Sequence, residues 1–109
     1  MLRDLGIPVN IKGHRYLREA VKLAVENIDR INNMTASIYT PIASANNTTP
    51  KKVINAISRA IEIGWDRGDL DTLWEYFKRS ISCRKGKPTN SECIAVLADK
   101  ILLSLGRTM

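Results

Sequence analysis

The chain has 109 residues, of which 44% are hydrophobic and 26% charged, a composition ordinary for one globular domain spanning residues 1–109. No apolar run approaches the roughly 20 residues of a membrane-spanning helix, and no signal peptide is visible. We therefore predict a cytoplasmic protein.

The net charge of +6 is unevenly distributed. Residues 37–60 carry three basic residues and no acidic one, and residues 78–93 carry five basic residues against one acidic. Between them, residues 61–77 carry five acidic residues against one basic. The two basic segments favour a polyanionic partner, and the acidic segment is expected to point away from it.

The sequence gives no sign of catalysis. Cys83, Cys93 and His14 are too few and too scattered for a zinc site, and two reduced cysteines are favoured over a disulfide. There is no glycine-rich phosphate loop and no serine or cysteine with a plausible nearby base. We predict that the protein is not an enzyme and uses neither a metal nor another cofactor.

The N-terminal half predicts an extended arm followed by an amphipathic helix. Residues 1–13 contain breakers at Gly6, Pro8 and Gly13, which indicate an arm packed on helices. A helix is predicted from Tyr16 to Asn32. Its inward stripe comprises Leu17, Ala20, Val21, Ala24, Val25, Ile28 and Ile31. Its charged residues are interpreted as a solvated face.

A helix-turn-helix is predicted over about residues 37–67. A short apolar helical segment covers 34–39, and Thr40-Pro41 begins a brief helix that ends near Ala45. Residues 46–48 form the turn, and a long helix runs from Pro50 to Arg67, capped by Thr49. In such motifs the second helix enters the DNA major groove.

The face of this long helix opposite its apolar stripe is basic and small-polar. The side chains expected to face DNA are Lys51, Lys52, Asn55, Ser58 and Arg59, with Ile54 at the margin. The alternative is an ordinary buried helix with a solvated back, because basic helix starts are common.

The C-terminal part predicts two further helices. One begins at Asp69 or Asp71 after Gly68, with Leu70, Leu73, Trp74 and Phe77 on its apolar stripe. A basic loop over 80–88 leads into a capping box, Thr89 to Glu92, and a last helix that ends at Gly106. Its inward residues are expected to be Ile94, Leu97, Ala98, Ile101, Leu102 and Leu105. The basic loop is either a phosphate clamp or a plain surface loop.

Three stretches make a resemblance specific: IPVNIKGHRYLREA, AIEIGWDRG and KPTNSECIAVLADKI. They resemble the C-terminal effector domains of the stage zero sporulation protein A family, response-regulator transcription factors of endospore-forming bacteria. The resemblance runs from Leu5 to about Leu103. It implies an all-α fold of about six helices around a helix-turn-helix, and binding to short DNA boxes, often in tandem, to activate or repress sporulation genes. The family's receiver domain is absent from these 109 residues.

The long helix departs from the family pattern. Where the family reads RVERAIRHAIEVAW, this chain reads KVINAISRAIEIGW. The base-contacting acidic residue and two arginines of the family correspond to Ile54, Asn55 and Ser58. Arginine pairs bidentately with guanine, asparagine prefers adenine, and isoleucine reaches only a thymine methyl group. We therefore expect an altered DNA box or weak binding through phosphates.

The resemblance also implies contact with the RNA polymerase sigma subunit. The corresponding positions are Thr72, Phe77 and Ile81, although Phe77 fits the hydrophobic core equally well. Tandem or homodimeric assembly on double-stranded DNA would follow the family pattern.

The sequence thus predicts a DNA-binding transcription regulator of the sporulation type. The residues expected to hold phosphates are Thr49, Arg84, Lys85, Lys87 and Asn90. The alternative is a protein-interaction module, an antagonist that binds sigma factor or a full-length relative and has lost specific DNA readout.

Overall fold

The computed structural model describes residues 11–67 and 89–106, and every element within them is helical. They form α1 (Lys12–Glu26), a 3-10 segment η2 (Ile28–Asn33), a π-helical segment η3 (Thr35–Tyr39), α2 (Thr40–Ala45), α3 (Pro50–Arg67) and α5 (Asn90–Ser104). The predicted all-α class is confirmed. The predicted helix over 69–77, the loop over 80–88 and the arm over 1–10 lie outside the described residues.

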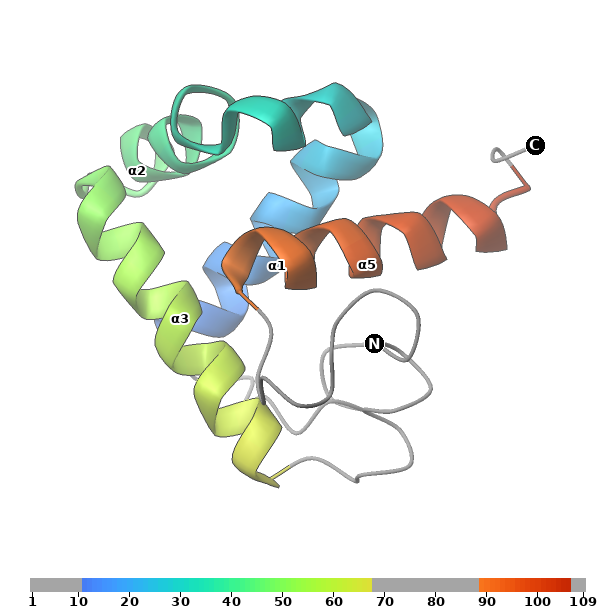
Figure 1. Cartoon of the computed structure of the whole chain (residues 1–109). Coiled ribbons are helices and arrows are strands. Elements are labelled where there is room, and N and C mark those ends of the chain that lie inside the picture. Colours follow the sequence, from blue (N-terminus) through green and yellow to red (C-terminus); the bar gives the residue numbers. More distant parts are fainter. Residues whose placement is uncertain (1–10, 68–88, 107–109) are drawn as a thin grey trace.

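Helix α1 is the centre of the packing. It contacts α3 along one side and α5 along another, while η2, η3 and α2 connect the far end of α1 to the start of α3 (Figure 1). The largest fully buried side chains come from four elements: Leu17, Ile38, Val53, Ile57, Cys93, Ile94 and Leu97. The predicted inward stripes of α3 and of the first part of α5 are confirmed by this core.

Helix α1 begins four residues earlier than predicted, because Gly13 does not break it. This glycine lies where α1 crosses α3. A Cβ atom added to Gly13 would lie 2.2 Å from the carbonyl oxygen of Ala56 and 2.7 Å from Cβ of Ala60. The glycine is therefore needed for the close approach of two helices, and the prediction of an extended arm was wrong at residues 12 and 13.

The predicted single helix over 16–32 is also wrong at its C-terminal end. Helix α1 ends at Glu26, and Asn27 adopts an extended conformation with φ −155° and ψ 101°. The side-chain oxygen of Asn27 accepts a hydrogen bond from the Asp29 backbone N–H at 3.1 Å, which starts η2. Asparagine competes with the helix by bonding its own backbone, so the chain turns here although the apolar spacing continues.

Three large apolar side chains among the described residues are exposed. Ile28 is 45% exposed, and Leu103 and Leu105 are 57% and 56% exposed. The prediction that Ile28 and Leu105 face the core was wrong. The break at Asn27 rotates Ile28 away from the α1 stripe, and Leu105 lies just beyond the last turn of α5.

The start of α5 follows its predicted capping box. The Thr89 hydroxyl accepts from the Glu92 backbone N–H at 3.2 Å, and the Glu92 carboxylate accepts from the Thr89 backbone N–H at 2.9 Å. At the other end Gly106 has φ +70°, the left-handed conformation that suits glycine after a helix. Within the described ranges no helix is both long and apolar enough to cross a membrane.

The close approach at Gly13 generates a stability prediction. Gly13→Ala is expected to lower the free energy of unfolding by about 1–3 kcal/mol, as overpacking does, although alanine normally favours a helix over glycine. Urea denaturation followed by circular dichroism measures the change. Arg18→Ala, at an exposed position of the same helix, is the control and should change stability by less than about 0.5 kcal/mol. A Gly13→Ala variant as stable as the native protein would contradict the packing account.

Candidate nucleic-acid interface

The turn between α2 and α3 has a defined hydrogen-bonded geometry. The Thr48 backbone N–H donates to the Ala43 carbonyl at 2.9 Å, and that of Asn47 donates to the Ser44 carbonyl at 3.4 Å. Asn47 has φ +57°, in the left-handed region that asparagine tolerates better than most residues. This pattern is a Schellman motif, which ends α2 sharply and fixes where α3 begins.

Thr49 then caps α3 as predicted. Its hydroxyl oxygen accepts from the Lys52 backbone N–H at 3.3 Å, and its carbonyl accepts from the Val53 N–H at 3.1 Å. Pro50 occupies the first position of the helix, where its missing N–H costs little. A short helix, a tight turn and a longer helix follow one another, which is the order of a helix-turn-helix.

The face of α3 away from the core is basic near its N-terminal end. Lys51, Lys52, Asn55 and Arg59 are exposed, as the helical spacing predicted. Among the residues that the structure describes, no carboxylate lies within 4 Å of the charged atoms of these three cations. Three exposed cations on one helix face favour an anionic ligand.

Ser58 and Ile54 lie on the other flank of α3 and are partly buried. The Ser58 hydroxyl donates to Oδ1 of Asn90 at 3.0 Å, and Nδ2 of Asn90 donates to the Ile54 carbonyl at 3.2 Å. Asn90, predicted to hold a phosphate, thus links the first turn of α5 to α3. We refer to Ser58, Asn90 and the Ile54 carbonyl as the α3–α5 polar link.

Tyr39 reaches the same polar link from η3. Burial raises the pKa of its phenol, and a hydrogen bond with the Asn90 side chain acts in the opposite direction. The side-chain amide of Asn90, which belongs to α5, therefore forms hydrogen bonds with residues of both α3 and η3. Both partly buried α3 residues predicted to read bases are packed toward α5, so the exposed basic flank is the face with free donors.

The remaining predicted contact residues cannot be placed. Arg84, Lys85 and Lys87 of the basic loop lie outside the described residues. The same holds for the predicted sigma-contact residues, Thr72, Phe77 and Ile81. Their roles stay predictions.

The structure adds a contact that the sequence reasoning missed. One guanidinium nitrogen of Arg15 in α1 donates to Oδ1 of Asn46 at 2.6 Å. Nδ2 of Asn46 in turn donates to the Glu19 carboxylate at 3.1 Å and to the Ile42 carbonyl at 2.8 Å. Arg15 directly precedes the predicted helix and belongs with its charged face, which is interpreted as solvated. Nothing in the spacing shows that Arg15 meets a turn 31 residues away.

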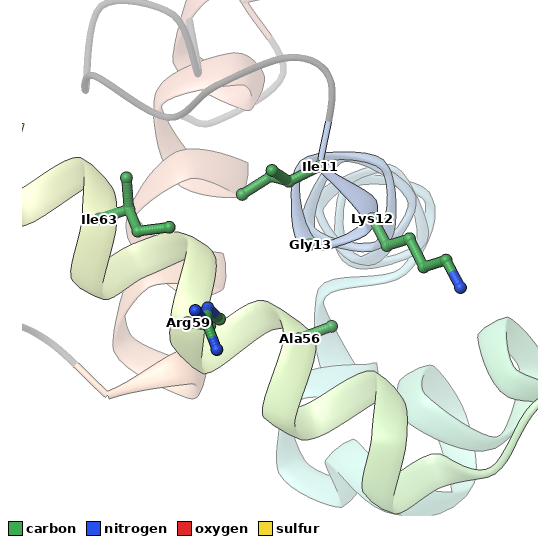
Figure 2. Close-up of a pocket in the computed structure, with 6 residues that line it drawn as sticks. All are labelled: Ile11, Lys12, Gly13, Ala56, Arg59 and Ile63. Carbon is green, nitrogen blue, oxygen red and sulfur yellow. The ribbon is translucent and has the colours of Figure 1, made fainter.

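A shallow pocket of about 180 Å³ lies where α1 crosses α3. Figure 2 shows Lys12 on its α1 side and Arg59 on its α3 side, with Gly13 and Ala56 where the two helices meet. Ile11 and Ile63 complete its lining. Both cations line the pocket, but the Lys12 side chain points away from Arg59 in this view.

The described residues do not form a reactive centre. No cluster of three or more histidine, cysteine or acidic side chains able to hold a metal occurs among them. Cys93 is buried, and burial raises the pKa of its thiol to about 12, so it stays protonated at neutral pH. Cys93 packs as a small hydrophobic side chain in the core.

An all-helical domain with a tight turn that leads into a basic helix is the architecture of a helix-turn-helix DNA-binding protein. The family described as "Sporulation initiation factor Spo0A C terminal" matches residues 1–101. The chain belongs to this family, which is a family of sporulation-initiation DNA-binding effector domains and not an enzyme family. The predicted resemblance is confirmed over nearly the whole chain.

The α3–α5 polar link predicts a stability effect. Asn90→Ala removes the partner of the Ser58 hydroxyl and is expected to lower the free energy of unfolding by about 1–3 kcal/mol. Asn90→Asp keeps an oxygen for Ser58 but removes the N–H donated to Ile54, so a smaller loss is expected. Thermal and urea unfolding of both variants measure the effect. Native stability in Asn90→Ala would show that the link contributes nothing.

The buried thiol gives a second prediction. In a Cys83→Ser variant, Cys93 should resist a disulfide-exchange reagent at pH 8, because its thiolate is scarce and its sulfur is covered. The reaction should begin only at denaturant concentrations that unfold the domain. Rapid modification of the native protein would mean that the α5 core opens readily.

Proposed function

We propose that this domain is a transcription regulator that reads double-stranded DNA with α3. The observation that carries the proposal is the exposed set Lys51, Lys52, Asn55 and Arg59, presented on a helix that a capped turn holds in place. An exposed basic helix of this kind fits the major groove, and its cations favour phosphates whatever the base sequence.

Base recognition is proposed to depend on Asn55. Its amide is exposed and suits bidentate pairing with adenine, whereas the Ser58 hydroxyl already donates to Asn90. Ile54 is partly buried against the core and offers an apolar edge at most. This division supports a DNA box different from that of family members with arginines at these positions.

The phosphate contacts are proposed to come from the start of α3 and from residues beyond it. Thr49 lies at the start of α3, and the basic residues Arg84, Lys85 and Lys87 are proposed to extend the contact along the duplex. Asn90 is assigned a positioning role here, because its amide is engaged in the α3–α5 polar link. The sigma contact through Thr72, Phe77 and Ile81 remains part of the proposal.

The second candidate is a protein-interaction module without specific DNA readout. The observation that favours it is the exposure of three large apolar side chains, Ile28, Leu103 and Leu105. Ile54 supports it less than expected, since this side chain packs against the core. The interaction-module alternative does not explain the basic face of α3, whose cations have no acidic partner among the described residues.

Fluorescence anisotropy with a randomised duplex pool and the family box, at two salt concentrations, tests the proposal. Selection of one sequence with a steep salt dependence is expected, because cation–phosphate contacts release counterions. The family box should bind more weakly than the selected sequence. Absence of binding to every duplex at low salt would overturn the DNA proposal and leave the interaction module.

Two variants separate base readout from phosphate contact. Asn55→Ala should weaken binding to the selected duplex by about 1–3 kcal/mol and leave the affinity for a random duplex unchanged. Lys52→Gln should weaken binding to both duplexes equally and reduce the salt slope by about one. The same anisotropy titrations measure both. Equal losses on both duplexes for Asn55→Ala would contradict its role in reading bases.

A further inference from the structure

We propose that the N-terminal end of α1 is a second DNA-contacting element, in which Lys12 and Arg15 bind phosphates of the strand that borders the groove occupied by α3. This inference rests on the proposed function. It adds two residues that the sequence analysis did not assign to DNA.

The first step is the geometry of the groove. The major groove is about 12 Å wide, and a helix with its side chains has a diameter of about 10–12 Å. A helix inserted there fills the groove from wall to wall, and the walls are the sugar-phosphate backbones. An element that packs beside the exposed flank of α3 can therefore reach one of these backbones.

Helix α1 packs closely on α3 at Ala56 and Ala60, which lie beside the exposed flank. Gly13 has no Cβ, and one placed there would be 2.2 Å from the Ala56 carbonyl oxygen. Lys12 is the preceding residue, is exposed, and lines the same pocket as Arg59 (Figure 2). The Lys12 side chain points away from Arg59, so Lys12 adds an exposed cation on the α1 side of the helix crossing.

Arg15 lies farther along α1, beside the start of α3. Its guanidinium is held by Asn46 at 2.6 Å and lies over the Tyr16 ring, 5.6 Å from the ring centroid. A guanidinium has five N–H donors, and one bond to Asn46 leaves others for an anion. Because the side chain is already ordered, binding a phosphate costs little further side-chain entropy.

The charge balance favours an anion across this surface. Two cations of α1 join three of α3, namely Lys12, Arg15, Lys51, Lys52 and Arg59. Against them stand Glu19, whose carboxylate accepts from Asn46, and Glu62, farther along α3. The surface therefore keeps an excess of positive charge along the flank where a strand would run.

The experiment compares Lys12→Gln and Arg15→Gln with Lys22→Gln in the same DNA titration. Lys22 is exposed on α1, ten residues and about 15 Å beyond Lys12. Lys22→Gln removes the same charge as Lys12→Gln and therefore serves as the control. Each lost phosphate contact should reduce the salt slope by about 0.9, which is about 3.5-fold in affinity across a fourfold change in salt. Arg15→Lys keeps the charge and should retain most of the slope. Lys22→Gln should leave the slope unchanged.

The possible results separate the two proposals. If the native domain binds DNA and Lys12→Gln and Arg15→Gln behave like Lys22→Gln, this inference is overturned and the function of α3 stands. If the native domain binds no duplex, both fail. If Arg15→Gln loses affinity together with thermal stability while Lys12→Gln has the control slope, the α1 contact is also refuted. A slope loss in both variants with native melting temperatures supports it.

Discussion

The close approach of α1 to α3 at Gly13 is the constraint on which the arrangement depends. A side chain there would collide with the Ala56 carbonyl and with Ala60, both fixed parts of α3. The contact sets the angle at which α3 leaves the core, because α1 also packs on α5. It further decides that the first residues of α1, including Lys12, lie beside the exposed flank of α3.

Polar contacts then fix α3 at two points. At its start, Arg15 and Glu19 of α1 hold Asn46, and the Schellman turn and the Thr49 cap define its first residue. In its middle, Asn90 of α5 binds Ser58 and the Ile54 carbonyl. Such anchoring favours DNA binding by a helix, because a helix that is already held in place loses less conformational entropy when it binds.

These anchors divide the outer surface of α3 into two flanks with different capacities. On the flank toward α5, polar groups form hydrogen bonds within the protein, as the Ser58 hydroxyl does with Asn90. The flank toward α1 keeps Lys52 and Arg59 exposed and gains Lys12 as a neighbour. We therefore expect the cationic flank to bind phosphates and the exposed amide of Asn55 to recognise bases.

The sequence by itself determined the all-helical class, the turn before α3, the Thr49 cap and the Thr89–Glu92 capping box. These features depend on residues within about four positions of each other, which spacing and capping rules describe. Local chemistry also ended α1 at Asn27, but the continuing apolar repeat concealed that signal.

Only the tertiary structure decided that Gly13 packs instead of breaking a helix, that Ser58 meets Asn90 32 residues away, and that Lys12 and Arg59 line one pocket. Such contacts depend on how whole helices cross. No local pattern around these residues encodes that crossing.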